Sequence, residues 1–139
     1  MQISENLRKM IADEFEYVVG KMHASKEPSQ KLYFFSAIYG VISRVLNIEY
    51  DSTLALIHLV VVTAHSTIDN RYRALGRGEE VGIGMAAGLF DKLTDATKML
   101  GNAIEKNSHP LEALEIIAVI VHSTTGNGYY LYQKGMLKI

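Results

Sequence analysis

Apolar residues recur at helical spacing along most of the chain. In residues 4–24 they fall at steps of three and four, with charged residues between them: Leu7, Ile11, Phe15, Val18 and Met22. This spacing places them on one face of an amphipathic helix. Ser4 is a suitable N-cap, and Pro28 follows the far end, where a proline cannot continue the helix. The pattern predicts a first helix over residues 4–24.

Four more segments carry the same kind of pattern. A second helix is expected over residues 29–46, and a third from Asp51 or Ser52 to Leu75, with Gly76 providing its left-handed end. Four glycines in residues 76–84 indicate a loop, after which an apolar stripe from Met85 to Ile104 predicts a fourth helix. Pro110, in an early helical position, opens a fifth.

One eleven-residue segment occurs twice. Residues 62–72 return as residues 119–129, 57 positions later, with Val, His, Ser, Thr, Asn and Tyr in matching places. A repeat of this spacing suggests a duplicated supersecondary unit. We therefore predict an all-α single domain, residues 1–139: a five-helix bundle with an N-terminal helix (4–24) and two tandem, duplicated helical hairpins (29–76 and 85–134). The glycine-rich loop, residues 76–84, joins the hairpins.

Residues 116–132 allow a second interpretation. β-Branched residues dominate Ile116–Val121, and Gly126-Asn127-Gly128 is suited to a hairpin turn, so a strand pair is the rival structure. The helix-favouring start at Pro110 and the absence of such a turn in residues 54–75 favour the helix.

Composition excludes several classes of protein. The chain has 139 residues, 48% of them hydrophobic, and 14 basic against 15 acidic residues give a net charge of -1. This is the size of one soluble domain, and it offers no overall field for nucleic acid or an anionic membrane. There is no cysteine, and residues 1–10 lack the apolar core of a signal peptide. The longest apolar stretch, residues 54–64, has 11 residues and is interrupted by His58. We expect a cytoplasmic protein with neither nucleic-acid nor membrane partners.

The duplicated motif is the candidate ligand site. Helices three and five run parallel in an up-down bundle, so the matching residues of the two copies are expected at similar depth. The alternative is a purely structural role, in which these polar groups form hydrogen bonds with the backbone groups that helix ends leave free. The functional hypothesis is a pocket for a small polar ligand, lined by His65, Ser66, Asp69, Asn70, Tyr72, His122, Ser123, Asn127 and Tyr129.

Catalytic uses of the motif have weaker support. His65, His122 and Asp69 would make a two-histidine, one-carboxylate metal set, but the second copy has Gly126 in place of Asp69. A serine nucleophile would need a cross-helix pair such as His122 with Ser66, because adjacent residues on a helix do not face each other. We predict no metal and no cofactor, and keep a hydrolase or metal-dependent enzyme using His65 and His122 as the alternative.

Three arginines lie at the end of the first copy of the motif or just after it, and the second copy has none. Arg71, Arg73 and Arg77, with the glycines of residues 76–84, could hold a phosphate or carboxylate at the start of the fourth helix. The alternative is a solvated loop whose cations favour the end of the third helix.

Helices three and five are apolar on nearly every face, more than a lone bundle covers. A second copy of the chain is the simplest cover, so we predict a homodimer. Tyr129, Tyr130 and Tyr132 fit packing onto the bundle or the second subunit. The sequence favours a small binding or structural module with a polar pocket, whose ligand it does not identify.

Overall fold

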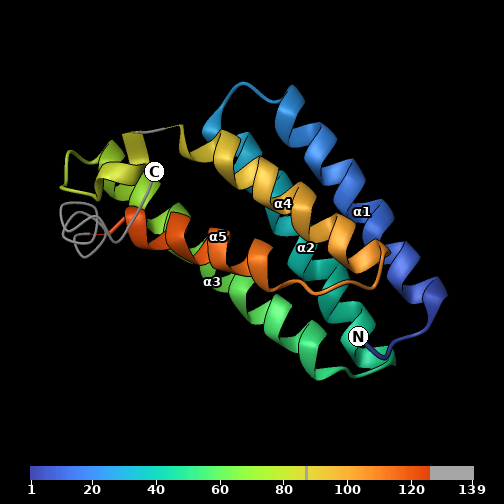
Figure 1. Cartoon of the computed structure of the whole chain (residues 1–139). Coiled ribbons are helices and arrows are strands. Elements are labelled where there is room, and N and C mark those ends of the chain that lie inside the picture. Colours follow the sequence, from blue (N-terminus) through green and yellow to red (C-terminus); the bar gives the residue numbers. More distant parts are fainter. Residues whose placement is uncertain (87, 126–139) are drawn as a thin grey trace.

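The fold of the described residues is entirely helical. The computed structural model describes residues 1–86 and 88–125, and this part of the chain contains five α-helices, one 3-10 turn and no strand (Figure 1). The elements are α1 (Glu5–Ala24), α2 (Pro28–Ile48), α3 (Ser52–Gly76), η1 (Ile83–Ala86), α4 (Leu89–Glu105) and α5 (Leu111–Ser123). The predicted all-α bundle is confirmed.

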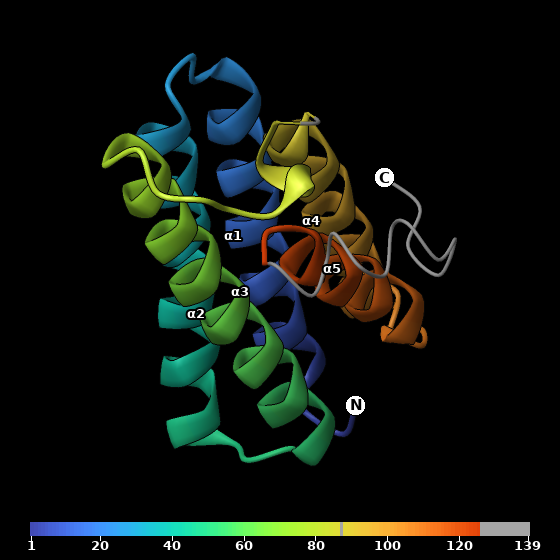
Figure 2. The same ribbon diagram turned by 90° about the vertical axis from the view of Figure 1, so that its left-hand side faces the viewer.

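The helices pack in a cyclic order. Along the chain, α1 packs against α2, α2 against α3 and α4 against α5, and the ring closes through contacts of α1 with α4 and of α3 with α5. Figure 2 shows α2 and α3 as one side of the bundle, with α4 and α5 on the other. The two helices of each predicted hairpin, as far as the described residues go, therefore pack against each other. Their origin by duplication stays a prediction.

The apolar stripes predicted from the sequence form the core. Ile11, Phe15, Val18 and Met22 of α1 are buried. The apolar stripe of α4 is buried as well, with the exception of Met85 before the helix: Leu89, Leu93, Ala96, Leu100 and Ile104. Large, fully buried side chains come from all five helices: Phe15, Phe35, Ile11, Met22, Ile38, Ile42, Leu54, Ile57, Ile68, Leu93, Leu100, Ile104 and Ile117. Burying such side chains is the main source of stability in a domain of this size.

The connection between the hairpins differs from the prediction. α3 continues through Gly76, and the left-handed residue is Gly78, with φ +76°. Residues 83–86 form a 3-10 turn, so α4 begins at Leu89 and not at Met85, after Gly88 with φ +69°. Glycine adopts positive φ without the steric cost that other residues meet, and several glycines in one segment did not reveal which of them turns the chain.

The fifth helix is shorter than predicted. α5 ends at Ser123, and Thr124 and Thr125 follow it in a turn and a bend. Residues 116–123 are helical, so the strand alternative is wrong for them. The remainder of the second hairpin, to residue 134, lies outside the described residues.

Asp51 caps α3, as one of the two predicted candidates. Its Oδ1 accepts a hydrogen bond of 2.9 Å from the Leu54 N–H, and its Oδ2 accepts one of 2.9 Å from the Gln2 N–H. Burial by itself would raise the pKa of this carboxyl, but the backbone N–H groups of Gln2 and Leu54 outweigh it, so the pKa lies below its ordinary value. The ionised side chain thus ties the start of the chain to the start of α3.

We expect Asp51→Ala to lower the free energy of unfolding by about 1 kcal/mol at neutral pH, because a helix N-cap is lost. Asp51→Asn keeps a capping acceptor and loses only the charge. A depressed folded-state pKa gives stability that is full above the unfolded value and lost as pH falls through the folded value. The advantage of wild type over Asp51→Asn should therefore shrink as pH falls below about 4.

Urea unfolding at several pH values measures this difference. Asp13→Asn, at an exposed carboxylate of α1, is the control for a general charge effect. The two pH values 6 and 2 lie on either side of the ordinary titration range of Asp. A difference in unfolding free energy between wild type and Asp51→Asn that stays constant between them would contradict the lowered pKa of Asp51.

Candidate functional site

The first copy of the motif lies wholly within α3. The His65 ring stacks on Phe35 of α2, with ring centroids 6.4 Å apart, and meets the edge of Tyr39 at 5.5 Å. His65 is half-buried, and Tyr72, about two turns further along α3, packs against the core. The His65 imidazole therefore faces α2, where aromatic packing accounts for its place.

The remaining polar residues of the first copy lie toward solvent. Ser66 and Asn70 are exposed, and Asp69 forms an ion pair of 3.0 Å with Arg73 one turn further along. Exposed pairs of this kind contribute little to stability. The residues predicted to share one pocket thus point in several directions from α3.

The second copy lies across the end of α5. The hydroxyls of Ser123, Thr124 and Thr125 donate to the carbonyls of Ile120, Val121 and His122, at 2.6, 2.7 and 2.9 Å. Such bonds back into the last turn satisfy carbonyls that a helix end leaves free. His122 is exposed. Asn127 and Tyr129 lie outside the described residues.

The two histidines therefore have different environments: one packs on α2 and the other is open to solvent. Within residues 1–86 and 88–125, no group of three His, Asp or Glu side chains is placed to hold a metal ion, so His65, Asp69 and His122 do not form one. The shared pocket for a small polar ligand stays a prediction.

The candidate anion site has two of its three cations already paired. Arg73 binds Asp69, and Arg77 binds Glu79. Arg71 is half-buried, and its Nε has no hydrogen-bond partner among the described residues. Two neutralised arginines leave a weaker anion site than the sequence suggested, and the site remains a prediction.

The glycine-rich loop has a packing role that the sequence did not reveal. Its Gly82 N–H donates to the Thr124 carbonyl at 2.8 Å, and a Cβ on Gly84 would lie 1.9 Å from the Ser123 Oγ. Figure 2 shows the segment between α3 and η1 crossing close to the end of α5. The two buried glycines let the loop lie on the second copy of the motif.

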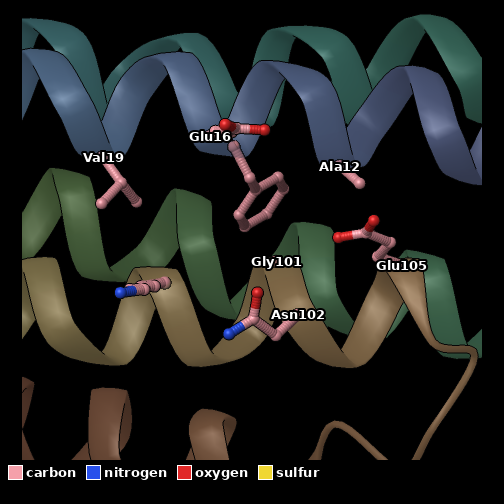
Figure 3. A pocket seen from close by; sticks show the side chains of 8 residues that line it. Ala12, Glu16, Val19, Gly101, Asn102 and Glu105 are labelled. Atoms are coloured by element: carbon pink, nitrogen blue, oxygen red, sulfur yellow. The ribbon is translucent and has the colours of Figure 1, made fainter.

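Two surface cavities lie away from the motif. A crevice of about 250 Å³ between α1 and α4 has Phe15 and Gly101 in its lining. Glu16 lies on its α1 side, and Asn102 and Glu105 on its α4 side (Figure 3). A groove of about 420 Å³ between α4 and α5 is mainly apolar, with Met99, Ile116 and Val119 in its lining. The polar residues around the crevice are exposed, which is ordinary for a groove between surface helices.

Charge is distributed unevenly over the outside of the bundle. The outward residues of α1 and α4 are rich in charge, including Lys9, Asp13, Asp95 and Lys98. From residue 52 to residue 68, by contrast, α3 has no Asp, Glu, Lys or Arg. Its exposed positions up to residue 73 follow steps of four and three, and we call them the outer stripe: Ser52, Leu56, Leu59, Thr63, Ser66, Asn70 and Arg73.

The outer stripe leaves large apolar side chains in solvent. Leu56 and Leu59 are 44% and 61% exposed. Among the described residues, α3 is the one helix long and apolar enough to cross a membrane by length and composition, a test that buried core helices of soluble proteins also meet. Only 28% of its most apolar stretch is buried, however. The apolar composition of α3 predicted uncovered surface on this helix but not which residues form it. This surface is the strongest candidate for a binding function.

Fold and surface together define a class: an all-helical bundle with a charged side and an uncharged, partly apolar helix face. No protein-family model, curated protein or solved structure significantly matches this chain.

Proposed function

We propose that this protein is a self-associating helical module, a cytoplasmic homodimer that assembles through the outer stripe of α3. The observation that supports it most is the combination of exposed Leu56 and Leu59 with 17 residues that carry no full charge. Solvent-exposed apolar patches on soluble proteins mark interaction sites. A surface without charge offers nothing to steer a charged partner, whereas the same patch on a second copy is complementary to it in a two-fold dimer.

The pattern of the stripe also suits helix pairing. Steps of four and three put its members along one side of α3, as in the contact seam of a coiled coil. Leu56 and Leu59 provide the apolar part, and Asn70 is a polar residue of the kind that sets the register in such a seam. Arg73, already paired with Asp69, ends the stripe without adding an unbalanced charge.

Leu59→Glu is expected to dissociate the dimer. A glutamate at the centre of the contact would lose its hydration without a partner, which costs roughly 2 kcal/mol or more and raises the dissociation constant at least about 30-fold. Sedimentation velocity over a concentration series measures this constant. The monomer should stay folded, because Leu59 is 61% exposed and contributes little to the hydrophobic core.

Met10→Glu is the matched control, at an apolar residue that is 43% exposed on the charged side of the bundle. It should leave the dissociation constant unchanged. A wild-type chain that sediments as a monomer at every concentration, or equal effects of Leu59→Glu and Met10→Glu, would refute the proposed function.

A further inference from the structure

The groove of about 420 Å³ between α4 and α5 leaves large apolar side chains in solvent. Met99 of α4 and Val119 of α5 both line it and are both exposed. Ala96 and Ile120, which also line it, are buried. Exposed apolar surface of this kind marks a binding site on a soluble protein. The groove therefore suits an apolar segment laid along the two helices.

The surroundings of the groove are mainly acidic. α4 and α5 together contain five Asp and Glu residues against two Lys and no Arg, a net charge of -3. Asp95 and Lys92 line the groove itself. Glu115 lies one turn before Val119 on α5, on the same side of the helix. Two such grooves facing each other would bring like charges together, which disfavours a second copy here, whereas a basic occupant is attracted.

The chain itself contains a segment of matching composition, which lies outside the described residues. Seven of the eleven residues 129–139 are apolar or aromatic, and the two charged ones, Lys134 and Lys138, are both basic. The sequence allows the tyrosines of this segment two places, on the bundle or on a second subunit. An apolar groove with acidic surroundings on the same bundle favours the first.

The route from the end of α5 to the groove is short. α5 ends at Ser123, and its lining residues lie within its last two turns, so Val119 is about 6 Å back along the helix. An extended chain covers about 3.3 Å per residue. Gly126-Asn127-Gly128 is a turn-forming sequence, at which the chain can reverse. Residues 129–139 are therefore long enough to return along α5, which runs roughly opposite to α4 (Figure 1).

We propose that residues 129–139 dock in the α4–α5 groove of their own chain. The apolar lining and the acidic surroundings match the composition of the segment, and the short tether holds its local concentration near the millimolar range, ahead of segments from other molecules. The groove is then an internal docking site. This inference does not depend on self-association through α3, which uses a different face of the bundle.

Thiol reactivity measures this docking, because the chain has no cysteine of its own. Val119→Cys places one thiol at the groove. Ala118→Cys, at the neighbouring exposed position of α5 outside the groove lining, is the matched control. A neutral maleimide is reacted with each thiol in the native whole chain, and rates in concentrated urea correct for intrinsic reactivity. The Val119→Cys thiol should be the protected one.

Replacing the apolar start of the segment should open the groove. With Tyr130→Ser, Leu131→Ser and Tyr132→Ser combined, the Val119→Cys thiol is expected to react at least about tenfold faster. This factor corresponds to about 1.4 kcal/mol in favour of the docked segment. The Ala118→Cys thiol should react at an unchanged rate, because it lies outside the groove.

Two further variants control for the fold and for the segment. Gln133→Ser, at a polar position of the same segment, should change neither rate. Ala113→Cys, at a buried position of α5, stays protected only while the bundle is folded. If its thiol reacts in the triple variant, Lys134→Glu with Lys138→Glu takes the place of the three serines. Like charges then oppose docking, and the Val119→Cys thiol should react severalfold faster.

The outcomes separate the possible occupants. Faster reaction of the Val119→Cys thiol in the folded segment variant, at a rate independent of protein concentration, supports docking within the chain. An unchanged rate overturns it. Protection that increases with protein concentration also overturns it and assigns the groove to another molecule. Leu59→Glu, which tests self-association through α3, should leave the protection as it is.

Discussion

Replacing Gly84 with alanine is expected to destabilise the fold by about 3 kcal/mol, the upper part of the range for overpacked sites. The new Cβ would lie 1.9 Å from the Ser123 Oγ and 2.4 Å from its Cβ. Ser123 has no room to give way, because its hydroxyl donates to the Ile120 carbonyl and the residue is buried. In the Gly84→Ala variant the loop must therefore move away from the end of α5, and the apolar side chains next to it become exposed to solvent.

Gly82→Ala should be as costly, but for a different reason. Its Cβ would meet backbone atoms only: the Ser123 and Thr125 carbonyl oxygens at 2.3 and 2.4 Å and the Thr124 carbonyl carbon at 2.5 Å. Ser123→Gly removes the side chain that obstructs Gly84→Ala and none of the atoms that obstruct Gly82→Ala. Ser123→Gly should therefore relieve the first substitution in part, because the Ser123 carbonyl carbon stays 2.8 Å from the new Cβ, and should not relieve the second.

Urea denaturation of the single and double variants measures this coupling. Gly20→Ala, on open helix surface, is the control for adding a methyl group and should be neutral or stabilising. Wild-type stability in Gly84→Ala, or equal relief of both glycine variants by Ser123→Gly, would contradict the packing of the loop on α5.

The second large effect is expected at Phe15, where α1 meets α4. Phe15 is 1% exposed and ranks among the largest fully buried side chains. Phe15→Ala should cost roughly 3–5 kcal/mol, from lost burial and the cavity left behind. A mutant that loses much less would show that α1 and α4 do not pack through this ring.

Gly101 makes that contact possible. A Cβ there would lie 2.8 Å from the Phe15 Cβ and 3.1 Å from its ring, so Gly101→Ala should destabilise the wild type although alanine favours a helix. With Phe15→Ala as background, the ring atoms at 3.1 and 3.2 Å are gone but the Cβ at 2.8 Å remains, so only the part of the penalty that comes from the ring should disappear. Thermal unfolding of the four proteins of this cycle measures the coupling. Additive effects would mean that the two residues do not contact each other.

Much of the fold follows from spacing alone. Apolar steps of three and four located α1, α2 and the stripe of α4, because a helix buries only one face and that face must be apolar. The capping carboxylate of Asp51 was recognisable for a similar reason, since its bond to the Leu54 N–H is local in the chain. Elements set by neighbours in sequence were predictable from sequence.

The connection between the hairpins was less predictable. Gly76, Gly78, Gly82 and Gly84 look alike in a sequence, yet the first is helical, the second has positive φ and the last two pack on α5. What separates them is the position of Ser123 and Thr124, about forty residues later in the chain. A contact over that distance has no local signature.

The candidate site shows the same division. The first copy of the motif lies within α3, as predicted, and the described part of the second copy lies at the end of α5, but the direction of each side chain depends on which helix lies beside it. His65 meets Phe35 and Tyr39, whereas His122 meets solvent. Identical residue types in two copies therefore acquire different surroundings, because each copy packs against a different set of neighbours.

The sequence by itself determined the helical class, the core-facing stripes and the unusual lack of charge in α3, since each of these is a property of residue type and spacing. Only the tertiary structure decided which apolar residues of α3 remain outside. Ile57, Val61 and Ile68 are buried, while Leu56 and Leu59 are not. Residues 54–62 of α3 are apolar at every position except His58, so each face of this part of the helix is suited to burial, and the packing of α2 and α5 selects the face that stays open.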